Sequence, residues 1–350
     1  MNRTVESNCM KKLLLLLIVN VSCFAAHAQQ KPYYTQYILN NYIINPAFAG
    51  IENYSDVKFS YRNQWQDLDG APVTTYLTFH KPFGKTDSRS TPTSMQSAAD
   101  NPYLNYGDDF STPSAHHGVG LTFISDKTGY VSRNTFGLTY AYHKPVSQQL
   151  ILSAGLTAGF TNVSLDRTKI VWGSLDPNDP AIGYNTGDLR KLMPELGVGI
   201  VLYDSSFFLS ASALNIVPGK LRFVKNDIYG DFFKPHIFLQ TGYKFYLNNS
   251  LSLIPSVSVQ FINPLPMFVH LNAKLNYENL FWVGAGCRLK DELSGLAVMT
   301  GINLGRSINL SYSYNSTVNG RLKTYVGNTH EVVVGITIGK KPESCPTNVW

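Results

Sequence analysis

Residues 150–161 read Leu-Ile-Leu-Ser-Ala-Gly-Leu-Thr-Ala-Gly-Phe-Thr. From Leu150 to Phe160 every second residue is apolar, and from Ser153 to Thr161 the positions between them carry serine, glycine or threonine. A period of two places these sets on opposite faces of a β-strand. Helical periodicity is absent, so the stretch predicts a strand with one apolar and one small, polar face.

The same alternation recurs along the chain, with turn signals between the segments. It predicts about fourteen strands, each near the 9–11 residues that a tilted transmembrane strand needs. Glycines on the polar face, such as Gly155 and Gly199, fit an inward face where side chains crowd or the sheet bends. The remaining segments lie at or near residues 57–65, 73–79, 117–126, 131–143, 196–202, 239–245, 257–261, 269–275, 283–287, 296–302, 308–314 and 332–338.

The composition indicates where such strands would lie. Only 15% of the residues are charged, whereas a soluble domain averages about 25%. The chain also has 21 Tyr, 19 Phe and 27 Gly, with no apolar run of transmembrane-helix length after the N-terminal region. A soluble sandwich or propeller would alternate too, but it would normally carry more surface charge. We therefore expect an all-β fold, a transmembrane antiparallel β-barrel of the outer membrane with an N-terminal extended leader.

The N-terminal residues 1–28 are predicted to be a signal peptide. Lys11 and Lys12 precede the apolar run 13–19, and Ala26-His27-Ala28 forms a small-x-small cleavage site. Without this segment the net charge is weakly positive and dispersed, which does not suggest nucleic acid. Cys287 and Cys345 would then be the remaining cysteines, and no Cys/His spacing indicates zinc.

A leader at residues 29–53 follows the signal, and we expect it in the periplasm. Its segment 33–50 reads YYTQYILNNYIINPAFAG and fits neither helix nor strand. Proline at 46 removes a backbone donor and biases Asn45 away from helix. Two interpretations remain open: an aromatic segment that packs at the mouth of the fold, and a partner-binding segment. The second would use Tyr37, Asn40, Tyr42, Asn45, Pro46 and Phe48.

The connections predict an orientation for a barrel at residues 54–340, with a tail at 341–350. Tight turns at 144–148, 204–206, 248–250, 278–279 and 305–306 alternate with long loops at 162–193, 215–234 and 316–328. Short turns belong to the periplasmic side of such barrels and long loops to the outside. One segment breaks this rule, because the polar loop 84–115 falls on the periplasmic side. It is either a disordered insertion or a docking arm for a periplasmic partner.

Two further sets of residues are candidates for contacts. The outer loop 215–234 combines basic and aromatic residues, which suits protein binding, although it could instead fold back over the lumen. Its candidate residues are Arg222, Phe223, Lys225, Tyr229, Phe232 and Phe233. Aromatic residues at strand ends suit interfacial girdles, although some are as compatible with packing or a place in the lumen; they include Tyr61, Tyr140, Tyr142, Tyr312, Tyr314 and Trp282.

The residues offer no catalytic constellation. His116 and His117 are adjacent, so strand alternation would separate their rings, and no nucleophile motif, P-loop or dinucleotide fingerprint occurs. The carboxylates from Asp176 to Asp188 could hold calcium, but Asp-Pro and Asn-Asp are also ordinary turn formers. We expect no enzyme activity and no cofactor, and the calcium question stays open.

Several segments resemble the PorP/SprF family of type IX secretion system outer-membrane proteins. The resemblance runs from the leader nearly to the C-terminus. It implies a non-enzymatic component of type IX secretion or gliding motility, which binds periplasmic secretion-ring proteins, a large surface-exported cargo protein such as an adhesin, or both. A porin or hydrophobic-solute channel is the alternative, and inward residues such as Arg62, Lys244 and Lys274 are compatible with it. The resembling segments are 34–37 with 45–50, 117–121, 126–129, 138–143, 309–314 and 330–332.

Overall fold

The structure is a computed structural model, which describes eleven stretches of the chain. The predicted signal peptide, the tail 341–350, the Asp176–Asp188 loop and the six candidate residues of the outer loop lie outside them. The described stretches are residues 37–87, 91–94, 114–166, 189–217, 234–248, 250–262, 267–278, 280–289, 295–305, 307–317 and 327–339.

The described residues form fifteen β-strands and three short 3₁₀ helices, η2 (Tyr37–Leu39), η3 (Asn41–Ile43) and η4 (Pro46–Phe48). Fourteen strands make the barrel, and the two-residue β9 is an extra one beside β10. The strands are β1 (Ser55–Asn63), β2 (Val73–Phe83), β3 (His116–Thr128), β4 (Val131–Pro145), β5 (Ile151–Leu165), β6 (Leu189–Tyr203), β7 (Phe207–Leu214), β8 (His236–Tyr243), β9 (Phe245–Tyr246), β10 (Leu251–Phe261), β11 (Phe268–Tyr277), β12 (Phe281–Leu289), β13 (Gly295–Leu304), β14 (Ile308–Thr317) and β15 (Thr329–Ile338).

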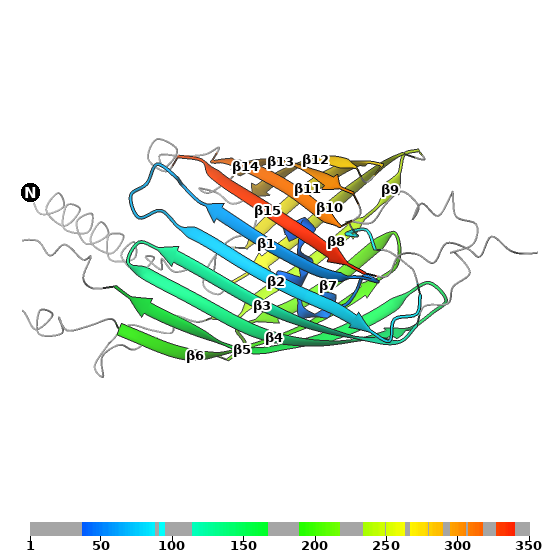
Figure 1. The fold of residues 1–350 in the computed structure, drawn as a ribbon, viewed down its shortest axis with the longest axis horizontal. Coiled ribbons are helices and arrows are strands. Elements are labelled where there is room, and N and C mark those ends of the chain that lie inside the picture. The colour runs from blue at the N-terminus through cyan, green and yellow to red at the C-terminus, as the bar shows by residue number, and fades with distance from the viewer. Residues whose placement is uncertain are drawn as a thin grey trace, which may run out of the picture. The chain divides into compact units, whose positions relative to one another are not determined.

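The sheet closes on itself. Each strand pairs antiparallel with its neighbours in the chain, apart from the step from β8 past β9 to β10. The first and last strands then pair from Ser55 with Ile338 to Asn63 with His330, so the barrel has no free edge (Figure 1). The predicted fourteen-stranded barrel is confirmed.

Alternation sets the two faces of the wall. Along β1, Lys58, Ser60 and Arg62 are buried inside, whereas Phe59 and Tyr61 are exposed on the outside. The outer face is an apolar surface for contact with lipid, and the inner face is polar, as in outer-membrane barrels. The phase predicted from the sequence is therefore confirmed.

Successive antiparallel strands place their connections on alternate rims. The short turns 146–150, 204–206, 247–250, 278–280 and 305–307 share one rim, here called the short-turn rim. The predicted loop 162–193 is shorter than expected, because β5 continues to Leu165 and β6 begins at Leu189. In these extensions Val163 and Met193 are buried together, with Val131 packed against them, and Glu195 Oε2 accepts a hydrogen bond from Thr161 Oγ1 at 2.7 Å.

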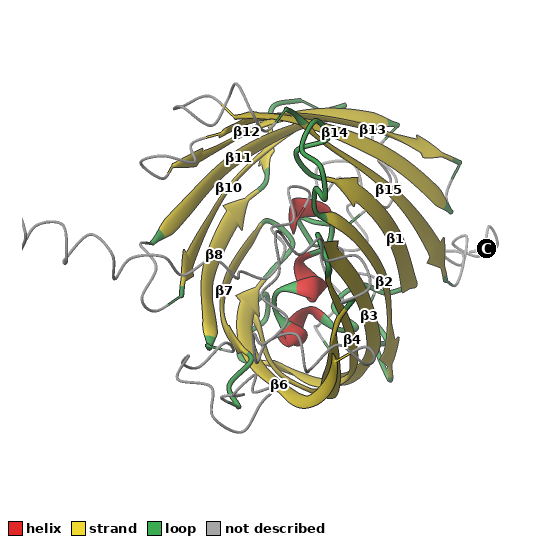
Figure 2. Cartoon of the chain, turned by 90° about the vertical axis from the view of Figure 1, so that its left-hand side faces the viewer, coloured by secondary structure: helices red, strands yellow, loops and turns green. Residues whose placement is uncertain are grey.

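The leader lies inside the barrel. We expected a periplasmic segment, but the three 3₁₀ helices occupy the interior, with strands on all sides (Figure 2). Every residue from Tyr37 to Glu52 is buried. We call residues 37–52 the plug. No helix in the described part of the chain has the length and hydropathy needed to cross a bilayer.

Candidate functional site: the plug inside the barrel

The plug crosses the lumen from one wall to the opposite wall. At its start, Ile38 and Leu39 pack with Trp282 of β12 and Met299 of β13. Further along, Phe48 belongs to a core cluster with residues of β4, β6 and β7. Apolar contacts at both ends therefore hold the plug across the full width of the barrel.

Trp282 takes one of the two places that the sequence left open for it. A strand-end aromatic suits either an interfacial girdle or the lumen, and Trp282 faces the lumen with only 1% of its surface exposed. Its ring lies against Gly301, where a side chain would overlap it, and Lys274 Nζ lies 4.7 Å from its centroid. The absent glycine side chain makes room for the indole, which in turn supports the plug.

Local chemistry explains the path of the plug near Asn45. This residue is extended, with φ −148° and ψ 114°, as expected before a proline. Its Oδ1 accepts a hydrogen bond from Ala47 N at 2.9 Å, which caps η4, and Pro46 occupies the first turn, where no amide donor is required. Gly50 follows with φ +74°, a conformation that favours glycine, and turns the chain toward β1.

Asn45 also joins the plug to the wall. Its Nδ2 donates to Ile200 O of β6 at 3.2 Å and to Ala211 O of β7 at 3.3 Å. Gly199 makes this approach possible, because a Cβ there would overlap Asn45 Oδ1. The single amide therefore bridges two strands and the plug backbone.

Serines of the wall satisfy carbonyl groups of the plug. Ser212 Oγ donates to Ile44 O at 2.6 Å, and Ser153 Oγ donates to Ala47 O at 2.8 Å. Irregular backbone that is buried, as here, needs such partners for its polar groups. The inward serines Ser153 and Ser212 thus serve as hydrogen-bond donors to the plug backbone.

Three histidines hold the next two residues of the plug. His143 Nε2 lies 2.8 Å from Ala49 O and His116 Nε2 lies 3.2 Å from Gly50 O, while Gly50 N donates to His80 Nδ1 at 3.3 Å. The rings of His116 and His143 stack with centroids 4.3 Å apart. His116 is buried and His117 is on the outer face, so the predicted separation of these adjacent rings is confirmed.

The first half of the plug makes side-chain hydrogen bonds on both sides of the lumen. They join three of the candidate leader residues to β2, β4 and β11. Asn40 Nδ2 donates to Thr78 Oγ1 at 3.0 Å, Tyr42 OH donates to Thr139 Oγ1 at 2.8 Å, and Asn272 Nδ2 donates to Tyr37 OH at 2.7 Å.

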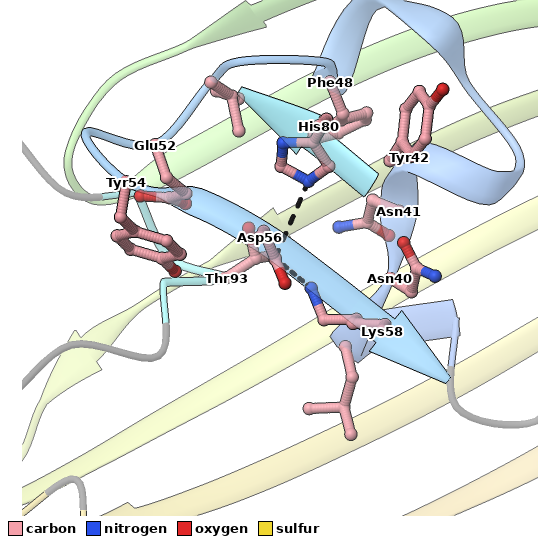
Figure 3. Close-up of a pocket in the computed structure, with 12 residues that line it drawn as sticks. Asn40, Asn41, Tyr42, Phe48, Glu52, Tyr54, Asp56, Lys58, His80 and Thr93 are labelled. Atoms are coloured by element: carbon pink, nitrogen blue, oxygen red, sulfur yellow. Dashed lines mark hydrogen bonds and ion pairs between the residues drawn. The ribbon is translucent and has the colours of Figure 1, made fainter. Parts of the chain in front are cut away.

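A polar cavity of about 20 Å³ lies between the plug and β1 and β2 (Figure 3). Asp56 forms an ion pair with Lys58 there, and His80 Nε2 lies 3.6 Å from Asp56 Oδ2. The side-chain amide of Asn41 and Glu52 Oε2 are buried in this region without a protein partner. The volume suits about one water molecule, which buried polar atoms of this kind usually bind.

The plug leaves the barrel at the short-turn rim, beside the start of the polar loop. Lys85 Nζ donates to Ile51 O at 2.6 Å, and Thr91 Oγ1 donates to Glu52 Oε1. Burial raises the pKa of Glu52, and Lys85 and Thr91 offset only part of this effect. The described start of the 84–115 loop is therefore fastened to the plug.

The end of the same loop returns to this place. Ser114 donates to Asp87 Oδ2 through its amide at 3.0 Å and through its hydroxyl at 2.9 Å. Burial acts to raise the pKa of Asp87, but Lys85 and the two Ser114 hydrogen bonds outweigh it, so the pKa is lowered. Both described ends of the loop thus form an ordered polar cluster at the rim.

The polar groups of this site hold the chain's own backbone. Among the described residues, no group of three or more His, Cys, Asp and Glu could hold a metal ion. The six candidate leader residues are brought together inside the barrel. The sequence did not indicate which residues of the wall contact them. The signal that could have found these partners is a polar residue or a glycine at an inward strand position. The residues concerned are Thr78, Thr139, Ser153, Gly155, Gly199, Ser212 and Asn272.

A closed fourteen-stranded barrel with a lipid-facing apolar surface and an inward plug defines an outer-membrane β-barrel protein. The chain belongs to the PorP/SprF family of type IX secretion system membrane proteins, whose family model matches residues 26–336. It is accordingly an outer-membrane component associated with that secretion system.

Solved structures show similar barrels at low sequence identity. Acinetobacter baumannii outer membrane protein Omp33 is 9% identical with a TM-score of 0.46, over 83% of this chain and all of that one. The CymD monoaromatic hydrocarbon channel is 12% identical with a TM-score of 0.44, over 89% of this chain and 94% of that one. A comparison with curated proteins finds no match.

Proposed function

We propose that this protein is a non-enzymatic, sealed component of the type IX secretion or gliding machinery. It binds periplasmic secretion-ring proteins, a large surface-exported cargo protein, or both. Membership of the PorP/SprF family supports a role in this machinery. The plug supports a binding function, because it lies in the path that solutes would take through the lumen.

The observation that carries the proposal is the way the plug spans the barrel. A porin or hydrophobic-solute channel needs an open path, whereas here Ile38 and Leu39 meet one wall and Pro46 and Phe48 approach the other. Inward cations that would suit a channel lie beside this segment; Lys274 contacts Trp282, which packs on the plug. Transport straight through the lumen therefore requires the plug to leave, whereas a hydrophobic-solute channel with a lateral opening would not.

Two surfaces are proposed for partners. The first is the short-turn rim, where Lys85, Asp87 and Ser114 fasten the polar loop over the end of the plug. Short-turn rims face the periplasm, so this rim would meet secretion-ring proteins. The second is the outer loop with Arg222, Phe223, Lys225, Tyr229, Phe232 and Phe233, which would meet the exported cargo.

A pull-down of the tagged mature protein in mild detergent, followed by mass spectrometry, tests the proposal. We expect recovery of ring components or of a large surface protein. Two variants test the two surfaces separately. Replacement of Arg222, Phe223 and Lys225 by serine should reduce recovery of the cargo protein. Lys85→Ser with Asp87→Ser should reduce recovery of ring proteins. An unrelated outer-membrane barrel, expressed to the same level, is the control. A barrel recovered alone at low salt contradicts the binding proposal.

Conductance in planar bilayers tests the alternative. A plugged barrel should remain closed under modest voltage, and deletion of residues 37–48 should open it. Steady conductance of the intact protein, together with unimpaired surface export in a strain lacking it, would favour the transport function.

A further inference from the structure

A cluster of histidine and tyrosine lies on the outside of the barrel, near the short-turn rim. His117 Nδ1 lies 2.7 Å from Tyr140 OH, and the His117 ring also contacts Tyr142, with centroids 5.1 Å apart. Tyr140 is 50% exposed and Tyr142 is 40% exposed. Their neighbours His116 and Ala141 are buried inside, so this cluster faces away from the plug and takes no part in holding it.

The strand register brings cations to the same place. Phe83 of β2, His117 of β3 and Tyr142 of β4 are paired in one row across the wall. On this outer face, Lys81 lies two residues before Phe83 and Lys144 lies two residues after Tyr142. Strands β2, β3 and β4 run side by side (Figure 1), so the lysines flank the aromatic row.

The described strand residues around this cluster carry no carboxylate. Residues 79–83, 117–121 and 138–144 contain no Asp or Glu. Lys81 Nζ lies 5.3 Å from the centroid of the Phe83 ring, which directs its ammonium along the wall. Further from the rim, Leu138 is 56% exposed and marks the hydrocarbon-facing part of β4.

This order of residues matches the depth profile of a lipid leaflet. Tyrosine rings sit at headgroup level, and lysine side chains extend their ammonium groups toward the membrane surface. Cations at that depth attract anionic headgroups. When the Tyr140 hydroxyl donates to His117 Nδ1, the imidazole keeps its proton on Nε2 and can donate it to a phosphate oxygen.

We propose that Lys81, His117, Tyr140, Tyr142 and Lys144 form a binding site for the phosphate headgroup of an anionic phospholipid. The leaflet beside the short-turn rim, which is the periplasmic leaflet in barrels of this kind, supplies the lipid. The two ammonium groups bind the phosphate charge, and the histidine and tyrosines fix the headgroup between them. This site would anchor the rim at which periplasmic partners are proposed to bind, but it does not depend on that function.

The opposite rim provides an internal comparison. His330 Nδ1 lies 2.6 Å from Tyr312 OH, and Tyr314 contacts the same ring. The outward-facing described residues around it on β1, β14 and β15, such as Tyr61 and Val332, include no lysine or arginine. The aromatic arrangement is therefore similar, and the lysine pair distinguishes the proposed lipid site.

Native mass spectrometry of the full protein, released from nanodiscs that contain phosphatidylglycerol and phosphatidylcholine, tests the proposal. Lys81→Gln with Lys144→Gln should reduce retention of phosphatidylglycerol about 25-fold, at roughly fivefold for each lysine near the surface. His330→Gln should leave retention unchanged. His117→Gln alone is a milder substitution that keeps both lysines, and it should give a smaller loss of phosphatidylglycerol retention. It replaces the double variant as the test if the double variant fails to fold.

Three results would overturn the proposal. The first is equal phosphatidylglycerol retention by the wild type and the lysine variant. The second is an equal loss in His330→Gln, which would mean that aromatic anchoring alone retains lipid. The third is displacement of the lipid by millimolar inorganic phosphate, which would identify a site for free phosphate instead of a membrane lipid.

Discussion

Removal of the Asn45 side chain should loosen the plug while leaving the barrel closed. Asn45→Ala deletes three hydrogen bonds, to Ile200 O, to Ala211 O and from Ala47 N. At a net value of about 1 kcal/mol for each, the plug would lose about 3 kcal/mol relative to the wall. Because every 1.4 kcal/mol corresponds to a tenfold change, local opening should become about 100-fold more frequent.

Hydrogen exchange followed by mass spectrometry measures this opening. The amides of Ala47, Phe48 and Ala49 report on the plug, since each is hydrogen-bonded within it at 2.9 to 3.2 Å. Their exchange should accelerate about 100-fold in Asn45→Ala, while the amides of the barrel strands keep their protection. Asn45→Ser keeps a capping oxygen, but its side chain is too short to reach β6 and β7. Its plug amides should therefore exchange at rates between those of Asn45→Ala and the wild type.

A control separates plug release from general damage. Ser311→Ala also removes a buried lumen hydrogen bond, from Ser311 Oγ to Val333 O at 3.3 Å, but within the β14–β15 wall. It should leave exchange at Ala47 and Phe48 unchanged. Unchanged plug exchange in Asn45→Ala, or an equal rise across the strands, would refute the assignment of Asn45 as the anchor.

Three further substitutions probe other parts of the plug. Gly118→Val should displace the plug backbone and raise conductance, because even a Cβ there would overlap Ala49 O; a closed channel with native exchange rates contradicts this. Trp282→Ala should cost about 3 to 5 kcal/mol by leaving a cavity, and exchange should rise around Leu39 more than in η4. The raised pKa of Glu52 means that its charged form opposes folding at higher pH. Glu52→Gln should therefore raise the urea midpoint of unfolding, followed by tryptophan fluorescence, at pH 8, and the two midpoints should converge below the ordinary carboxyl pKa of 4.5. Equal midpoints at pH 8 contradict this.

The barrel could be predicted from the sequence because alternation is a local property. In β5 the apolar residues fall at every second position, and this alone determines which side chains face lipid. The low share of charged residues then favours a membrane barrel over a soluble sheet. The ends of β5 and β6 were predicted less accurately, since the buried pair Val163 and Met193 continues these strands beyond the apolar alternation.

The location of the plug could not be predicted in the same way. Tyr37–Glu52 has no periodicity, so nothing local assigns it to a face. Its place depends on pairs far apart in sequence, such as Asn45 with Ala211 and Tyr37 with Asn272. Trp282 illustrates the same limit, because a strand-end aromatic can face lipid or lumen, and only its packing partner decides which.

The inward glycines lie in the barrel strands, and some of them contact the plug. We predicted crowding or bending of the sheet at inward glycines, and for particular residues the structure shows which atoms a side chain would meet. A Cβ at Gly118, Gly155 or Gly199 would overlap the plug, whereas a Cβ at Gly159 would overlap Phe136 O of the wall itself. The glycines of β3, β5 and β6 that face the plug therefore leave room for a second layer of chain inside the barrel. Such a cluster of small inward residues beside an apolar, unpatterned leader is a sequence signal for a filled lumen, and alanine substitution at these three positions provides its direct test.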